Sequence, residues 1–279
     1  MTITAEAVKQ LRERTGAGMM ECKKALVEAG GNLDAAADLM RRQGLAKADK
    51  KATRIAAEGI VVAQVRDHKR HASLVEVNCE TDFVAREGSI RHLATQAADL
   101  ALEHRPSSVE ALLQCKLSAG GTLDEFRRGL VAKIGENITV RRFAVIEAET
   151  IVGSYIHGTR IGALVALKGG DEALARELAM HVAAMNPEYI SAADVPADIV
   201  SKEREIFAEQ VKGEGKPAEI AGRIVDGKLR KRLNEISLTG QIFIKDDKAT
   251  VESLLKKAGA QVTAIVRFEV GAGIEKKQH

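Results

Sequence analysis

The chain has 279 residues, a formal net charge of +3, and 42 basic residues interspersed with 39 acidic ones. This balance argues against a nucleic-acid coat or a polybasic membrane anchor and favours a folded protein partner, and the length predicts several modules rather than a single core. The three cysteines are scattered and include no Cys-x-x-Cys pair, which indicates a reducing compartment. The sequence shows no basic segment leading into an apolar run and no stretch of about 18 apolar residues, so we expect a soluble, cytoplasmic protein.

Residues 1–45 are expected to form a module of three short helices. Apolar residues recur there at helical spacing, and glycines at 16, 18, 30 and 31 separate the three segments. Residues 46–54 are basic and rich in alanine, without a sustained apolar face, and we interpret them as a linker.

Two similar units of strands and helices follow, and they predict an α+β core in two parts. The first subdomain spans residues 55–150, with a hairpin over 55–77, helices over about 90–102 and 123–134, and a strand over 139–146. The second spans 151–186 and 237–279, with a hairpin over 152–167, helices over 171–184 and about 251–257, and a strand over 261–270. Hairpins make both sheets antiparallel.

Residues 187–236 interrupt the second subdomain with a purely helical pattern. Two apolar-spaced segments of about four turns flank a break at 213–217 that contains two glycines and a proline. We expect an inserted antiparallel helical hairpin, or short coiled coil.

Thr81, Asp82, Phe83 and Val84 form the most informative stretch, because they place an acid beside an aromatic ring just after an apolar strand. Phe83 is one of six phenylalanines, and the chain has no tryptophan. Burial preference favours a Phe83 that opens the next helix and packs inward. The alternative is a functional loop carried by rigid structure.

Other candidate residues suggest contact surfaces more than chemistry. Met19 and Met20 are adjacent, so either one packs in a small core or both serve an interface; His157 lies at a hairpin turn that could touch a partner. The glycine-rich segments lack the spacing of a phosphate-binding loop, and the histidines and cysteines do not form a metal-ligand pattern. We therefore expect no bound nucleotide, metal or cofactor.

Two long segments carry a resemblance to a known family, at residues 11–26 and 76–86. Together with shorter segments at 133–138, 153–158, 237–241 and 267–271, they resemble the bacterial elongation factor Ts family. The resemblance implies a guanine-nucleotide exchange factor for the GTPase elongation factor Tu, not an enzyme. It also implies a ubiquitin-associated-like amino-terminal module, a two-part α+β core and an inserted helical hairpin.

The same resemblance assigns partner contacts. Thr81, Asp82, Phe83 and Val84 correspond to the segment that displaces Mg²⁺ from elongation factor Tu, Met19 and Met20 to contacts with its nucleotide-binding domain, and His157 to a contact near its phosphate side. The hairpin at 187–236 would contact the GTPase or a second copy of this chain. Some relatives continue beyond residues 273–279 into a further helix.

Two other classes of function remain as alternatives. An RNA-binding translation protein could use the basic stretches at 41–54 and 223–232, although aromatic residues are sparse. A small hydrolase could use Cys79 or a carboxylate pair such as Glu80 and Asp82, although acidic neighbours raise a thiol pKa and the sequence contains no convergent base or oxyanion motif.

Overall fold

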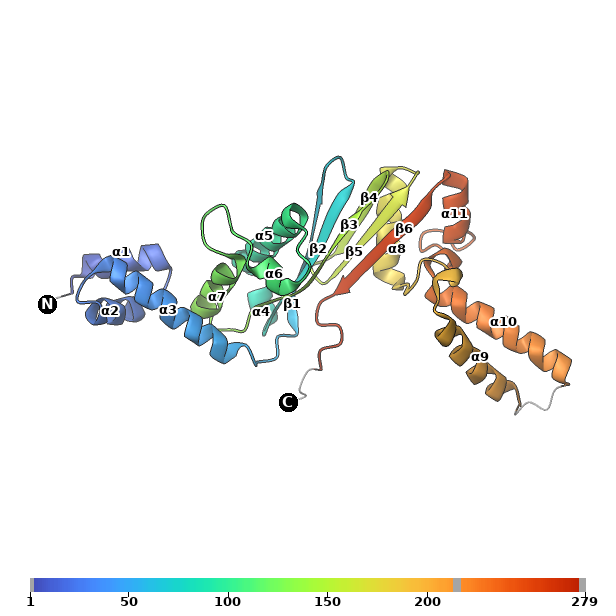
Figure 1. Ribbon diagram of the computed structural model, residues 1–279, viewed down its shortest axis with the longest axis horizontal. Helices are drawn as coiled ribbons and strands as arrows, with labels where there is room; N and C mark the ends of the chain where they lie inside the picture. Colours follow the sequence, from blue (N-terminus) through green and yellow to red (C-terminus); the bar gives the residue numbers. More distant parts are fainter. Residues whose placement is uncertain (1–2, 213–216, 276–279) are drawn as a thin grey trace. The chain divides into compact units, whose positions relative to one another are not determined.

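The computed structural model describes residues 3–212 and 217–275, apart from the side chains of 45–47, 49 and 218 (Figure 1). The chain divides into two compact units: unit 1 is Met1–Gln64, Val75–Ala144 and Phe268–His279, and unit 2 is Val65–Leu74 and Val145–Arg267. Each division falls within a strand, whereas the predicted subdomain limits near 150, 186 and 237 fall between elements.

Three helices open unit 1: α1 (Ala5–Thr15), α2 (Met19–Glu28) and α3 (Leu33–Lys51). Gly16 ends α1 in the left-handed region at φ 65°. The helices share a small core of Val8, Leu11, Cys22, Ala25, Leu26 and Ala36. The predicted linker at 46–54 is wrong for most of its length, because α3 continues to Lys51, whose ammonium group donates to the carbonyl of Gly135.

A three-stranded antiparallel sheet has the order β1 (Glu58–Arg66), β2 (His71–Cys79), β3 (Thr139–Glu147), and most of each strand belongs to unit 1. Four helices lie between β2 and β3 in sequence: α4 (Asp82–Ala85), α5 (Gly88–His104), α6 (Val109–Leu113) and α7 (Leu123–Ile134). The long helix α5 buries one apolar face, and α7 packs against both α5 and α3.

A fully buried carboxylate ties the sheet of unit 1 to the carboxy-terminal segment. Glu76 on β2 accepts hydrogen bonds from Arg141 at 3.0 Å, from Arg142 at 2.5 Å and from the backbone N–H of Gly271 at 2.9 Å. Burial raises the pKa of Glu76, but the Gly271 N–H and the two guanidinium groups outweigh burial and hold that pKa below its usual value.

Unit 2 contains the second antiparallel sheet, of order β4 (Ile151–His157), β5 (Ile161–Lys168), β6 (Gln261–Glu269). The register of β4 and β5 pairs Ile151 with Leu167 and His157 with Ile161. Helix α8 (Glu172–Met185) packs on this sheet, and a Cβ at Gly153 would lie 2.0 Å from the carbonyl oxygen of Ala175, so only glycine permits this approach. Helix α11 (Val251–Ala258) precedes β6.

A buried histidine joins α8 to the segment after the helical insertion. The Nδ1 atom of His181 accepts the backbone N–H of Ile244 at 3.2 Å, so Nε2 carries the proton and donates to Gln241 Oε1 at 2.9 Å. The ring stacks on Phe243 at 5.8 Å between centroids. Burial lowers the pKa of His181, and the hydrogen bond with Gln241 opposes it.

The insertion in unit 2 consists of α9 (Ala197–Lys212) and α10 (Ala218–Ile236), which pack against each other. Arg204 pairs with Asp226 at 3.0 Å and Arg232 with Glu203 at 3.4 Å across them. The predicted break at 213–217 lies outside the described residues except for Pro217. The predicted α+β class with two antiparallel sheets is confirmed, whereas α6 and the short 3-10 helices η1 (Ala192–Asp194) and η2 (Leu238–Gly240) escaped prediction.

Candidate functional site

Phe83 projects from α4, a helix of four residues that is separated from β2 by Glu80 and Thr81. Thr81 is the N-cap, with extended backbone, and its hydroxyl accepts the backbone N–H of Val84 at 3.3 Å. Val84 and Ala85 face inward, with 7% and 9% of their surface exposed, whereas Phe83 exposes 78%. The alternative that burial preference favoured, in which Phe83 packs inward, is therefore wrong, and the aromatic ring stands in solvent on a capped turn, where a partner could contact it.

Among the described residues, one partner holds the carboxylate of Asp82 beside this ring. Its Oδ2 accepts a hydrogen bond from Arg86 at 2.7 Å, one turn along the chain. About half of the Asp82 side chain and more than half of the Arg86 side chain are solvent-exposed, so the pair contributes little to stability and can exchange partners.

Glu136, which the sequence interpretation missed, organises the backbone that precedes Phe83. It follows α7, which ends at Gly135 in the left-handed region at φ 90°. Its Oε2 accepts the backbone N–H groups of Glu80 and Thr81, both at 3.0 Å, and its Oε1 accepts the Thr81 hydroxyl at 2.7 Å. Its place within the family-like segment at 133–138 was the only available signal.

Cys79 cannot act as a nucleophile in this setting. The side chain is fully buried, and its thiol donates to the carbonyl of Thr81 at 3.2 Å. Burial, and then the carboxylates of Glu136 and Glu58, raise the pKa of Cys79 to about 12. The thiol is protonated at neutral pH, which contradicts the hydrolase alternative based on this residue.

The neighbouring carboxylates are engaged separately instead of converging as an acid–base pair. Glu80 Oε1 accepts the backbone N–H of Asn137 at 2.6 Å and lies 3.6 Å from the Arg54 guanidinium, while Asp82 pairs with Arg86. Within residues 3–212 and 217–275, no three His, Cys, Asp or Glu side chains gather as metal ligands would. In the same part of the chain, no helix has the length and apolarity that crossing a membrane requires.

Met19 and Met20 are the first two residues of α2, exposed to 60% and 72%. Cys22, Ala25 and Leu26 fill the core positions of α2, so the interpretation that one methionine packs in the core is wrong. Two apolar side chains thus lie on the surface where α2 begins.

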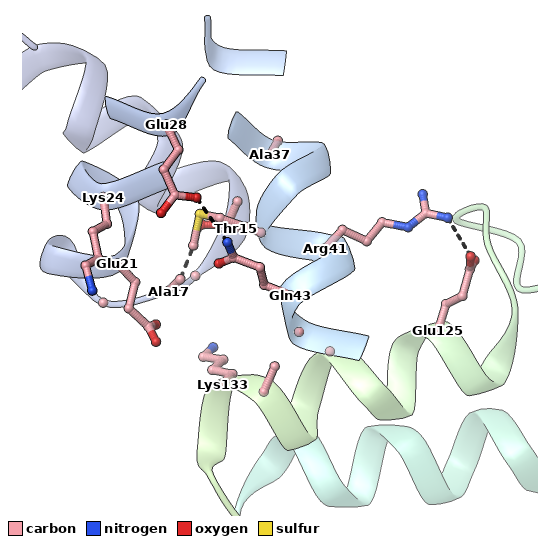
Figure 2. Close-up of a pocket in the computed structure, with 16 residues that line it drawn as sticks. Thr15, Ala17, Glu21, Lys24, Glu28, Ala37, Arg41, Gln43, Glu125 and Lys133 are labelled. Atoms are coloured by element: carbon pink, nitrogen blue, oxygen red, sulfur yellow. Dashed lines mark hydrogen bonds and ion pairs between the residues drawn. The ribbon is translucent and has the colours of Figure 1, made fainter. Parts of the chain in front are cut away.

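A cavity of about 540 Å³ lies between this three-helix module and α7, all within unit 1 (Figure 2). The 15–18 turn, α2, α3 and α7 line it. Arg41 on α3 pairs with Glu125 on α7 at 2.6 Å, and Gln43 donates to Glu28 at 3.2 Å (Figure 2). The lining mixes both signs of charge, which gives the cavity no clear preference for an anion or a cation.

His157 ends β4 and is exposed. Its Nδ1 lies 3.2 Å from the hydroxyl of Tyr155, and the two rings are 6.2 Å apart. His157 belongs to unit 2, whereas Thr81, Asp82, Phe83 and Val84 share one turn of unit 1. The four predicted residues therefore form one continuous surface turn, and His157 is a separate candidate contact in the other unit.

The chain is similar to one family along its whole length. The sequence profile of the family described as Elongation factor TS matches residues 80–272. Proteins named Elongation factor Ts from Methylococcus capsulatus and Alkalilimnicola ehrlichii are 53% and 54% identical over 279 residues, covering 100% of this chain and 95% of each relative. One from Hydrogenovibrio crunogenus is 51% identical over 275 residues, covering 99% of this chain and 94% of the relative.

Proposed function

The chain belongs to the elongation factor Ts family, and on this premise we propose that it releases GDP from elongation factor Tu so that GTP can rebind during translation elongation. The observation that carries the proposal is Phe83, 78% exposed on a capped turn. Because the ring is held in solvent on an ordered backbone, the unbound chain lacks the stabilisation that burial of the ring would supply. A partner that covers it recovers this free energy.

Exchange needs binding and no covalent chemistry. A protein that binds the nucleotide-free GTPase more tightly than the GDP-bound one must, by thermodynamic linkage, weaken GDP binding by the same factor. The chain therefore acts by selecting one state of its partner, and it needs no nucleotide, metal or cofactor of its own.

The target within the partner is its Mg²⁺ and phosphate site. Mg²⁺ demands near-ideal octahedral oxygen coordination, so small displacements of its ligands weaken the site and leave the phosphate charge less compensated. We assign Phe83 as a wedge between helices of the GTPase, with Thr81 and Val84 holding its turn. Asp82 is its polar companion, because its carboxylate can leave the exposed pair with Arg86 for a donor on the partner.

Further contacts enlarge the interface. Met19 and Met20 are assigned to the nucleotide-binding domain of elongation factor Tu, since exposed methionines suit adaptable contact surfaces. His157 is assigned to the phosphate side of the partner. The helical hairpin, α9 and α10, is assigned to a second contact with the GTPase or to pairing between two copies of this chain in the cytoplasm.

The test is release of fluorescent GDP from elongation factor Tu, followed by stopped flow at increasing concentrations of this chain. The proposal predicts a release rate that rises with the concentration of the chain and saturates. A rate equal to spontaneous release at every concentration contradicts it. An RNA-binding protein would instead leave GDP release unchanged and bind RNA with an affinity that falls steeply with salt.

A further inference from the structure

We propose that Glu136 is a positioning residue for Phe83: its carboxylate, together with that of Glu80, clamps the segment before α4 and so fixes the direction in which the ring projects. The inference rests on the proposed function, because it concerns how the exchange surface is presented. It goes beyond that function by naming a residue that needs no contact with the partner.

The Glu136 carboxylate makes three hydrogen bonds to two consecutive residues. Oε2 takes the N–H groups of Glu80 and Thr81, and Oε1 takes the Thr81 hydroxyl. Hydrogen bonds to an ionised carboxylate are shorter and stronger than neutral ones. The Thr81 hydroxyl donates to Glu136 and accepts from Val84, so the carboxylate also orients the side chain that caps α4.

The clamp is reciprocal. While Glu136 holds the backbone of Glu80, the Glu80 carboxylate holds the backbone N–H of Asn137 at 2.6 Å. The Asn137 side chain continues the network, donating to the carbonyls of Ala52 at 3.3 Å and Arg54 at 2.7 Å. The segment before Phe83 is therefore fastened to the loop after α7, and that loop to the chain after α3.

Phe83 needs such external positioning because its own helix is too short to supply it. Helix α4 has four residues, which is below the length at which a helix is stable in isolation. The ring itself, 78% exposed, makes few contacts that could orient it. Its direction is set by the backbone of 81–85, which Val84 and Ala85 anchor from inside and Glu136 fixes at the start.

The experiment measures GDP release from elongation factor Tu with Glu136→Ala and Glu136→Gln in the full chain. Alanine removes all three acceptor contacts, and we expect exchange at limiting concentration to fall about tenfold. Glutamine keeps one acceptor oxygen, and we expect a loss of about threefold. Glu103→Ala, which removes an exposed glutamate from α5, should change exchange less than about twofold.

A double-mutant cycle with Phe83→Ala separates positioning from a direct contact. If Glu136 acts only through Phe83, adding Glu136→Ala to Phe83→Ala should lower exchange less than about twofold further. Multiplying losses would overturn the inference, because they would mean that Glu136 contacts the partner or supports the whole fold. If Glu136→Ala does not fold, the same cycle with Glu136→Gln decides.

The outcomes also separate this inference from the proposed function. Absence of exchange by the unaltered chain contradicts the proposed function, whereas exchange that is insensitive to Phe83→Ala overturns the assignment of the ring as a wedge and this inference with it. Exchange that is sensitive to Phe83→Ala but unchanged by both Glu136 variants leaves the function standing and overturns the inference. Thermal unfolding of every variant supplies the folded fraction to which the rates are normalised.

Discussion

Phe83→Ala should weaken binding to elongation factor Tu while leaving the stability of the fold almost unchanged. Full burial of a phenylalanine contributes about 1.5–3 kcal/mol, and only about a fifth of Phe83 is covered in the free chain, where it is 78% exposed. Phe83→Ala should therefore lower the free energy of unfolding by only about 0.5 kcal/mol. If the partner covers the rest of the ring, the loss in binding is about 2 kcal/mol, or about 30-fold.

Stopped-flow release of fluorescent GDP measures the loss in binding to the partner, and urea unfolding measures the loss in the free energy of unfolding. We expect GDP release at limiting concentration to slow at least about tenfold with Phe83→Ala. Phe126 on α7 offers a matched control, since its ring is half-buried and meets His92 edge-on at 5.5 Å between centroids. Phe126→Ala should cost more stability than Phe83→Ala and should leave the exchange of the folded fraction within about twofold.

Two results would refute this reasoning. Unchanged GDP release with Phe83→Ala would mean that the exposed ring is not part of the exchange surface. A loss of stability as large as that of Phe126→Ala would mean that Phe83 supports the fold, so that a slower release would no longer report on contact with the partner.

Three further predictions follow from other residues. Burial lowers the pKa of His181 below its ordinary 6.5. As pH drops, the unfolded chain therefore takes up the proton first, and the free energy of unfolding should fall below about pH 6.5. Urea unfolding at several pH values should show this slope, and His181→Gln should flatten it. Glu76→Gln weakens the buried network with two arginines and Gly271, and should lower the free energy of unfolding at pH 7 by about 3 kcal/mol. A loss under about 1 kcal/mol, measured by urea unfolding, would contradict this. Replacing Met19 and Met20 by serine should weaken binding to elongation factor Tu about fivefold in calorimetry without changing the thermal midpoint, and unchanged affinity would remove them from the interface.

Local periodicity predicted most of the fold, because most elements bury one regular apolar face. The helix expected over 123–134 is α7 with the same limits, and the two hairpins are β1–β2 and β4–β5. Helix α6 was missed because five residues are too few to display a period. The linker was misread because α3 extends past its own core and is held by α7, including a close approach of Gly44 to Ala132.

The candidate site was less accessible to sequence reasoning because its parts are distant along the chain. Glu136 lies 55 residues from Thr81, and no local pattern indicates that its carboxylate meets that backbone. The exposure of Phe83 was indicated by the family resemblance alone, because average burial preference favours an inward phenylalanine. The side of α4 that each residue occupies determines its exposure: Val84 and Ala85 lie on the inward side, which leaves Phe83 on the solvent side.

The exposed apolar side chains assigned to the partner share a local position. Phe83 is the second residue of α4, and Met19 and Met20 are the first two of α2. Helical side chains point back toward the amino terminus, so those of a first turn project beyond the helix end, where no preceding turn covers them. The caps differ: Thr81 bonds to Val84 and Glu136, whereas Gly18 has no side chain to cap α2. The same position can thus present a fixed ring at α4 and adaptable thioethers at α2, which suits a wedge in one place and a conforming contact in the other.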